Sequence, residues 1–419
     1  MAEQAHMKGD DAAESRMRTS RESAPWVLVA GGFHARGGMD KANAALAAHL
    51  LERGTPLHLV AHSVAPELAG HALVTAHLVA RPAGSYLLGE YLLSREGRRA
   101  AAEVTAVRPD ARVVVNGGNC IWPDINWVHY VHGAWSPGRP GAPVWFRVKD
   151  GAARAWALGR ERRALLAARL VIANSESTRE ALVEAYGLKR DSVRVVYLGS
   201  DEGAAAVSAA ERNAARAWLS VAGRRPQVAF VGGLGLDQRK GLDTLLRAWR
   251  SLCARPEWDA DLIIAGGGRG LAAVEKQIAY EGLAGRVRLL GFTNRVAEVL
   301  AASDLLVSPA RYEAYGLNVH EAVCRGVPAM VSAGAGVAEL YPAELSEMLL
   351  PDAEDAADLA ARLLRWRAET EEWKSRFAPF AARLRRRAWG DAAAEFVRVA
   401  EGDVHSAGAA GEALASCPA

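Results

Sequence analysis

Short apolar runs, separated by longer segments with helical periodicity, recur along the first half of this 419-residue chain. The apolar runs cover residues 26–30, 57–60, 112–115, 125–131 and 170–173. The helices predicted among them cover residues 42–53, 154–169 and 177–186. Because strands that alternate with helices usually form parallel β-α-β units, this half predicts an α/β domain with a parallel sheet.

The same alternation begins again after residues 195–199, which we interpret as a linker. A second series of apolar runs covers residues 227–231, 261–265, 287–290 and 304–308. A chain of this length is too long for one ordinary hydrophobic core. The pattern therefore predicts two Rossmann-like domains, with ligands bound where the loops after the carboxyl ends of both sets of strands meet.

Polar and small-residue segments flank the two series at the ends of the chain. The first 24 residues are polar and charged and lack the apolar core of a signal peptide. The last segment is rich in Ala, Gly and Ser and has little to bury. The predicted units are a disordered tail at 1–24, a first domain at 25–198, a second domain at 199–385, a crossover helix at 386–402 and a flexible tail at 403–419.

The net charge of +3 gives no reason to expect a nucleic-acid partner. Residues 1–200 nevertheless carry 25 Lys and Arg against 19 Asp and Glu, whereas the remainder carries 26 against 29. The excess is greatest in segment 139–169, which has eight basic and two acidic residues together with Trp145, Phe146 and Trp156. This segment is either a solvated face of an Arg-rich helix or a surface that contacts an anionic membrane, and the sequence leaves both open.

The cysteines indicate a reducing compartment. Cys120, Cys253, Cys324 and Cys417 are widely separated and show no paired spacing. No apolar run reaches the length of a membrane-spanning helix. We therefore expect a cytoplasmic protein, with peripheral contact at the inner face of a membrane as an open option.

The most informative segment is 307–331, VSPARYEAYGLNVHEAVCRGVPAMV. It predicts a buried strand, a glycine-containing turn and a helix that begins at Leu317, and the free N–H groups at such a helix start bind phosphate readily. Glu313 and Glu321 stand on either side of this anion site, where carboxylates accept hydrogen bonds from hydroxyls rather than bind phosphate. A ligand with phosphate in the middle and hydroxyls at both ends fits this arrangement, which describes a nucleotide sugar.

The pattern S-P-x-x-x-E-x-(Y/F)-G-L-x-x-x-E-A-x-x-x-G-x-P in this segment resembles the donor-site signature of the retaining GT-B glycosyltransferases of family 4. The resemblance extends over residues 26–402. It implies a GT-B fold, in which two Rossmann-like domains face each other across a cleft and a C-terminal helix crosses back to the first domain. Trp389 is similar to the tryptophan that this helix carries in the family.

The resemblance also assigns donor-binding roles in the second domain. Phe230-Val231-Gly232-Gly233 leads from a strand to a basic pair at a helix start, which suits a diphosphate. Lys240 corresponds to the family's phosphate lysine, whereas Gly233 stands where the family usually has an arginine, and Arg239 is expected to supply that charge. The full set of donor-binding residues implied is Arg239, Lys240, Gly291, Phe292, Glu313, Tyr315, Gly316, Leu317, Asn318 and Glu321.

The first domain contributes the opposite wall of the expected cleft. Gly37, Gly38 and Lys41 resemble the family's glycine loop, which approaches the donor phosphate and the acceptor. His132 follows the strand predicted at 125–131 and is similar to the histidine that contacts the donor sugar near the reacting carbon. The catalytic residues implied are therefore His132, Glu313 and Lys240.

The resemblance implies a retaining transfer of a sugar, with a UDP- or GDP-sugar as the expected donor and a glycan, lipid-linked or small-molecule acceptor, as in cell-envelope glycan synthesis. No cofactor and no metal are expected, and the Asp-Ala-Asp at 259–261 is assigned no metal because it directly precedes an apolar strand. A non-catalytic nucleotide-sugar-binding protein and another enzyme on the same fold, such as an epimerase or a phosphorylase, remain alternatives. A dinucleotide-dependent oxidoreductase is disfavoured because the first strand is not followed by G-x-G-x-x-G.

Overall fold

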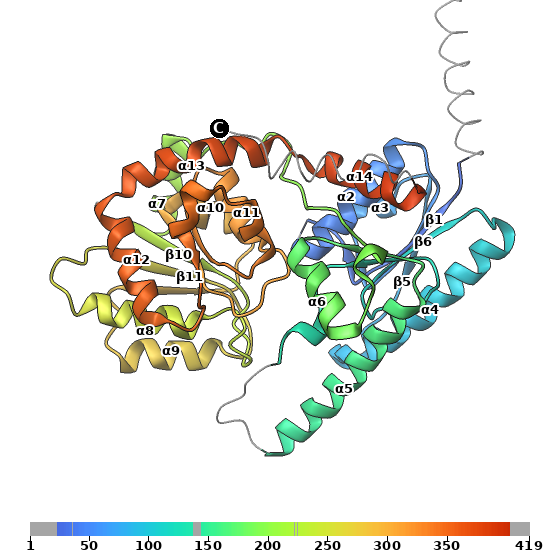
Figure 1. Cartoon of the computed structure of the whole chain (residues 1–419), viewed down its shortest axis with the longest axis horizontal. Helices are drawn as coiled ribbons and strands as arrows, with labels where there is room; N and C mark the ends of the chain where they lie inside the picture. Colours follow the sequence, from blue (N-terminus) through green and yellow to red (C-terminus); the bar gives the residue numbers. More distant parts are fainter. Residues whose placement is uncertain (1–22, 36, 137–143, 222, 224, 403–419) are drawn as a thin grey trace, which may run out of the picture.

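The structure is a computed structural model that describes residues 23–35, 37–136, 144–221, 223 and 225–402. Arg36, Arg139 and most of the two predicted tails (1–22 and 403–419) therefore lie outside the described residues. Figure 1 shows two α/β domains side by side, the first in blue to green and the second in yellow to orange.

The first sheet is parallel throughout and has the strand order β5-β3-β1-β6-β7-β8-β9. Its strands are β1 (Trp26–Val29), β3 (Leu57–Ala61), β5 (Val74–Leu78), β6 (Arg112–Asn116), β7 (Ile125–Val128), β8 (Leu170–Ala173) and β9 (Val193–Val195). Two short strands, β2 (Gly32–Phe33) and β4 (Ser63–Val64), pair beside it. β7 ends three residues earlier than predicted, so His129, Tyr130 and Val131 follow the strand instead of belonging to it.

The second sheet is also parallel and has the order β12-β11-β10-β13-β14-β15. Its strands are β10 (Gln227–Val231), β11 (Asp261–Ala265), β12 (Val287–Gly291), β13 (Leu305–Ser308), β14 (Ala329–Ser332) and β15 (Leu349–Leu350). In both sheets the first strand is central and the order reverses next to it, between β1 and β6 and between β10 and β13. Ligands of such sheets bind at this reversal, beyond the carboxyl ends of the strands.

Helices cover both faces of the sheets. Those of the first domain are α2 (Gly38–Glu52), α3 (Pro66–Ala69), α4 (Tyr86–Val107), α5 (Val144–Ala167) and α6 (Glu176–Tyr186). Those of the second are α7 (Ala209–Trp218), α8 (Leu242–Cys253), α9 (Leu271–Tyr280), α10 (Val296–Ala302), α11 (Leu317–Cys324), α12 (Ala356–Ala368) and α13 (Thr370–Arg385). α5 begins ten residues before the predicted helix at 154, and α11 has the predicted start at Leu317.

The last helix, α14 (Trp389–Glu401), belongs to the core of the first domain although it follows the second domain in the chain. Figure 1 shows it continuing from α13 across to α2. Trp389 and Phe396 are buried in the same apolar cluster as Leu46 of α2 and Trp127 of β7, so the predicted crossover is confirmed. The GT-B arrangement expected from the sequence is therefore present.

Two chain segments pass between the domains, and they are hydrogen-bonded to each other. The backbone N–H of Ser200 donates to the carbonyl of Arg387 at 2.8 Å, and the N–H of Trp389 donates to the carbonyl of Ser200 at 3.0 Å. A Cβ on Gly199 would lie 2.4 Å from the carbonyl oxygen of Ala388, so only glycine permits this approach. The predicted boundary at 198/199 falls in this segment, which belongs to neither sheet.

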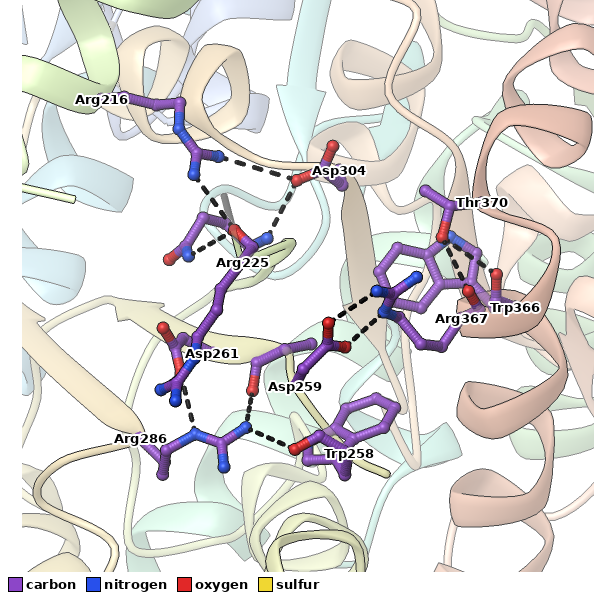
Figure 2. A network of polar contacts seen from close by, with 12 residues as sticks. Arg216, Arg225, Trp258, Asp259, Asp261, Arg286, Asp304, Trp366, Arg367 and Thr370 are labelled. Atoms are coloured by element: carbon purple, nitrogen blue, oxygen red, sulfur yellow. Dashed lines mark hydrogen bonds and ion pairs between the residues drawn. The ribbon is translucent and has the colours of Figure 1, made fainter. Parts of the chain in front are cut away.

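A network of arginine and aspartate pairs surrounds the amino ends of the strands in the second domain (Figure 2). Asp304 is 6% exposed and accepts hydrogen bonds from the N–H of Gln227 at 2.9 Å and from Arg212 at 2.6 Å. Arg286 donates to Asp261 at 2.8 Å on the neighbouring strand. These contacts join α7 to the first residues of β10 and β13 at the edge of the sheet opposite the ligand-binding edge.

Candidate active site

A cleft of about 1110 Å³ lies between the carboxyl ends of the two sheets. The first domain contributes the loop after β1, the residues after β7 and Asn174 after β8, and the second contributes the loops after β10, β11, β12 and β13. Trp389 and the linker residues Leu198–Ala205 line it as well. The cleft thus lies at the strand-order reversals of both sheets, where the sequence pattern predicted a ligand.

Most of the predicted site residues line this one cleft. Those that line it are Gly37, Gly38, Lys41, Arg239, Lys240, Phe292, Glu313, Tyr315, Gly316, Leu317, Asn318 and Glu321. Two others do not belong to its lining but adjoin it: Gly291 precedes Phe292 in the chain, and the His132 ring contacts the ring of Tyr130 edge-on. Phe292, the residue after Gly291, is 81% exposed and presents an open aromatic face in the cleft.

The start of α11 forms the middle of the cleft. Gly316 precedes the helix with φ +103°, and a Cβ there would lie 2.9 Å from Val337, so glycine is required on both counts. The Asn318 side chain donates to the carbonyl of Val231 at 2.9 Å and ties α11 to the end of β10. The first N–H groups of a helix have no partner within it, so this end of α11 offers donors to an anion in the cleft.

Each carboxylate of the Glu-x₇-Glu motif is paired with a lysine. Lys240, just before α8, pairs with Glu313 from the same domain. Lys41 of α2 in the first domain pairs with Glu321 at 2.9 Å and with Asp201 of the linker at 2.8 Å. Burial lowers the pKa of Lys41, but the two carboxylates outweigh it, so the pKa is raised above its ordinary value and Lys41 is a cation.

Asp201 is a residue of the cleft that the sequence pattern did not single out. Its carboxylate accepts a hydrogen bond from Trp389 Nε1 at 3.0 Å in addition to its pair with Lys41. Asp201 follows the apolar residues of the linker, and nothing in its local sequence marks it as part of a site. Only the return of α14 to the first domain brings it next to Trp389.

Arg239 precedes Lys240 in the chain. It is the residue expected to replace the arginine that the family usually has at the position of Gly233. Its guanidinium stacks over the ring of Tyr130 at 5.1 Å and donates to the carbonyl of Tyr312 at 3.4 Å. Gly233 leaves open space, because no atom lies within 4 Å of the position of a Cβ. Arg239 therefore lies on the cleft lining next to Lys240, and its role toward the diphosphate stays a prediction.

The two histidines after β7 lie in different environments. His129 lines the cleft, packs against Trp127 and has a buried Nε2 without a hydrogen-bond partner among the described residues. Burial lowers the pKa of His129 to about 3, so its ring is neutral at physiological pH. The His132 side chain is 41% exposed, and its Nδ1 lies 3.1 Å from Glu161.

The amino end of α6 fastens the first domain to the donor loop of the second. Ser175 is the N-cap of α6, and its hydroxyl also donates to the carbonyl of Ala314, between Glu313 and Tyr315. The Glu339 carboxylate of the second domain accepts from the N–H of Glu176 at 3.0 Å and from the hydroxyl of Tyr197 at 2.9 Å. These interdomain contacts have no local signal in the sequence.

Comparison with known proteins agrees with this geometry. Residues 36–203 match the family described as Glycosyltransferase Family 4, and residues 225–367 match the family described as Glycosyl transferases group 1. The two matches lie one in each domain, on the elements that form the cleft.

The chain belongs to glycosyltransferase family 4. It is 35% identical over 178 residues to the D-inositol 3-phosphate glycosyltransferase of Rhodococcus opacus (strain B4), a match that covers 40% of this family 4 chain and 39% of that protein. The alpha-D-kanosaminyltransferase of Streptomyces kanamyceticus is 29% identical over 243 residues, covering 57% of this chain and 60% of that one. The family 4 chain thus spans less than two thirds of the length of these relatives.

Solved structures share the fold over most of this family 4 chain. WaaG, a glycosyltransferase involved in lipopolysaccharide biosynthesis, superimposes with a TM-score of 0.69 at 16% identity and covers 90% of this chain and 100% of that one. Anabaena HepE in complex with UDP and glucose has a TM-score of 0.64 at 17% identity, covering 90% and 100%. At these identities the likeness establishes the GT-B fold. None of the described helices combines the length and the apolar character that crossing a bilayer requires.

Proposed function

We propose that this family 4 chain is a retaining glycosyltransferase, which moves a sugar from a nucleoside diphosphate sugar to an acceptor hydroxyl. The observation that carries the proposal is the convergence of Glu313, Glu321 and Lys240 around the start of α11 in one cleft. Carboxylates that accept hydrogen bonds from hydroxyls stand on both sides, and positive charge stands in the middle. This order fits the sugar, the diphosphate and the ribose of the donor.

In this proposal Glu321 accepts hydrogen bonds from the ribose and Glu313 from the transferred sugar. Both carboxylates are now paired with lysines, so the hydroxyls take over or share those contacts when the donor binds. Lys240, Arg239 and the first amides of α11 then face the diphosphate. Cleavage of the anomeric C–O bond places negative charge on the diphosphate, and positive groups held there in advance stabilise the transition state.

The acceptor approaches from the wall made by the first domain, near Gly37, Gly38 and Lys41. Its hydroxyl attacks the anomeric carbon from the side of the leaving group, and a donor phosphate oxygen takes its proton, which accounts for retention without a protein nucleophile. His132 orients the sugar. The proposal requires neither a metal nor a further cofactor, and it allows glycans, lipid-linked glycans and small hydroxylated molecules as acceptors.

The base of the donor is the least constrained part of the proposal. The base-binding loop, Gly291 and Phe292, offers backbone groups and an exposed ring, neither of which selects one base. HepE has been solved with UDP and with UDP-glucose, which supports a uridine donor ahead of guanosine. The names of the relatives supply no common acceptor.

One observation favours a second candidate, a nucleotide-sugar-binding protein without turnover. Gly233 leaves open the place of a diphosphate-binding arginine, and the Arg239 guanidinium that would replace it is stacked on Tyr130. Binding of a donor without release of nucleoside diphosphate would select this candidate.

The proposal is tested by incubating the purified chain with UDP-, GDP-, ADP- and dTDP-sugars, with and without a panel of acceptors. The assay measures release of nucleoside diphosphate, and proton NMR of the product gives its anomeric configuration. We expect release with one base, an α-donor giving an α-product, and a loss of at least about tenfold in Glu313→Gln. Release no faster than in Glu313→Gln, or an inverted product, contradicts the proposal.

A further inference from the structure

Glu161, on α5, is a buried carboxylate for which the donor site gives no role. Its side chain is 1% exposed. The backbone N–H of His132 donates to its Oε2 at 2.9 Å, and the His132 ring nitrogen Nδ1 lies 3.1 Å from its Oε1. The hydroxyl of Tyr186, from α6, is hydrogen-bonded to the same carboxylate. A buried carboxylate is tolerated when several donors satisfy it, and Glu161 has three among the described residues.

The direction of these hydrogen bonds fixes the tautomer of His132. The Tyr186 oxygen accepts from the N–H of Gly133 at 3.1 Å, so the tyrosine's own proton is available to Glu161. Burial and the adjacent Glu161 raise the pKa of Tyr186 above its ordinary value, which keeps it a donor. A carboxylate only accepts, so Nδ1 of His132 carries the proton of the neutral ring and Nε2 keeps its lone pair.

The position of Glu161 is itself held by the loop after β6. The neighbouring Arg160 is 7% exposed and donates to the carbonyls of Gly118 at 3.1 Å and Asn119 at 2.9 Å. A Cβ on Gly118 would lie 3.2 Å from the backbone of Glu161, so α5 packs directly on this loop. Glu161 therefore lies on a part of α5 that is packed against the loop after β6.

His132 lies one aromatic ring away from the donor site. Its ring contacts the ring of Tyr130 edge-on, with centroids 4.8 Å apart. Tyr130 lines the cleft and carries the Arg239 guanidinium on its face at 5.1 Å. With its backbone and Nδ1 both bound to Glu161, His132 has only Nε2 left to offer, on a side chain that is 41% exposed.

We infer that Glu161 is a positioning residue, which holds His132 with Nε2 free to accept a hydrogen bond from a hydroxyl of the substrate. The inference rests on the proposed function, because it presupposes a hydroxylated substrate in the cleft. That hydroxyl belongs either to the transferred sugar or to the acceptor, and both present the same donor to Nε2. Tyr186 donates to Glu161 and accepts from the N–H of Gly133, and these hydrogen bonds help to keep the His132 ring from flipping.

The first arm of the test needs no activity. ¹⁵N NMR of histidine-labelled protein, with His132→Ala to assign the signal, reports which ring nitrogen carries the proton. We expect the Nδ1–H form in the wild type and a mixture of tautomers in Glu161→Gln. Glu395→Gln is the matched control, since Glu395 is 3% exposed, pairs with Arg387 and does not contact His132, and it leaves the His132 signal unchanged. An Nε2–H form in the wild type overturns the inference, even if Glu161→Gln fails to fold.

The second arm measures turnover. Glu161→Gln lowers kcat about tenfold in the wild-type background but has no further effect in His132→Ala, because it acts through His132. If the hydroxyl belongs to the sugar, donor hydrolysis without acceptor falls as well; if it belongs to the acceptor, only transfer falls. Equal losses in both backgrounds overturn the inference. A wild type without turnover rejects the proposed function instead and leaves the NMR arm to decide the geometry.

Discussion

Lys41 of the first domain and Glu321 of the second form an ion pair of 2.9 Å across the cleft. A second pair, Lys240 with Glu313, lies within the second domain. Both carboxylates of the donor motif are thus paired with lysines. Of the two lysines, Lys240 lies where the diphosphate is proposed to bind, so it stabilises Glu313 before binding and the phosphates afterwards.

Removing Glu321 is expected to abolish donor binding without unfolding the protein. Glu321→Ala removes the acceptor for the ribose hydroxyls, and the affinity for a nucleotide sugar falls at least about tenfold. Lys41 retains its pair with Asp201, so no charge is left alone and the thermal midpoint changes little. Calorimetric titration with the donor gives the affinity, and Glu344→Ala, an exposed carboxylate of the same domain, is the control.

Gly241 is expected to tolerate no side chain. It has φ +70° before α8, and a Cβ there would lie 1.8 Å from the carbonyl oxygen of Pro309. Gly241→Ala therefore lowers the thermal midpoint by an amount corresponding to more than about 1–2 kcal/mol, and it displaces Lys240 and weakens donor binding. Gly285→Ala, where no atom lies within 4 Å of the new Cβ, serves as the control. Equal midpoints in the two variants would be incompatible with the close approach of α8 to β13.

The network at the amino edge of the second sheet is expected to affect stability alone. Asp304→Ala removes the carboxylate that accepts hydrogen bonds from Arg212 and the N–H of Gln227 and that pairs with Arg216, at a cost of about 2–3 kcal/mol. The donor affinity at 25 °C stays at the wild-type value, because the cleft lies at the opposite edge of the sheet. Thermal unfolding checks the expected loss of stability, and titration with the donor checks that the affinity is unchanged. Glu344→Ala, which removes an exposed carboxylate of the same domain, is the control, and an Asp304→Ala midpoint as high as in that variant counts against the network.

Acid is expected to destabilise the protein through His320. This residue is 1% exposed on α11, and burial, followed by the charges of Arg387 and Lys41, lowers its pKa to about 4. Between pH 6.5 and 4 the unfolded chain binds a proton at this position and the folded chain does not, so stability falls as the pH falls, by up to roughly 3 kcal/mol.

The thermal midpoint measured from pH 7.5 to 4.5 checks this sign. His320→Leu removes the titrating group, and its midpoint falls less over the same range than that of the wild type. Loss of the hydrogen bond between Tyr315 and His320 lowers the midpoint of the variant at pH 7.5, so the slopes are compared rather than the absolute values. If the midpoints of the wild type and His320→Leu fall equally with pH, His320 has the same pKa in the folded and the unfolded chain, which contradicts the prediction.

The strands and the donor loop could be predicted because their signals are local. The apolar runs that begin at Trp26 and Gln227 are the central strands of the two sheets, and the helix predicted at Leu317 begins there. Periodicity and a glycine turn are properties of neighbouring residues, so one sequence is enough to find them.

The residues that the sequence did not reveal act over long distances in the chain. Glu161 contacts His132 from 29 positions away, and Asp201 contacts Trp389 from 188 positions away. Their local surroundings are those of an ordinary helix and an ordinary linker. The strand at β7 was predicted too long for a related reason, since His129 and Tyr130 continue its apolar pattern but turn into the cleft.

The most direct test of the nucleotide-sugar site is a thermal-shift screen of the wild type and Glu321→Ala against UDP-, GDP-, ADP- and dTDP-sugars. A ligand that binds only the folded state raises the midpoint, and the rise grows as its concentration exceeds Kd. We predict a rise with the sugars of one base in the wild type and none in Glu321→Ala. A wild type that responds to no nucleotide sugar, or a variant that responds as strongly as the wild type, would contradict the assignment of the cleft.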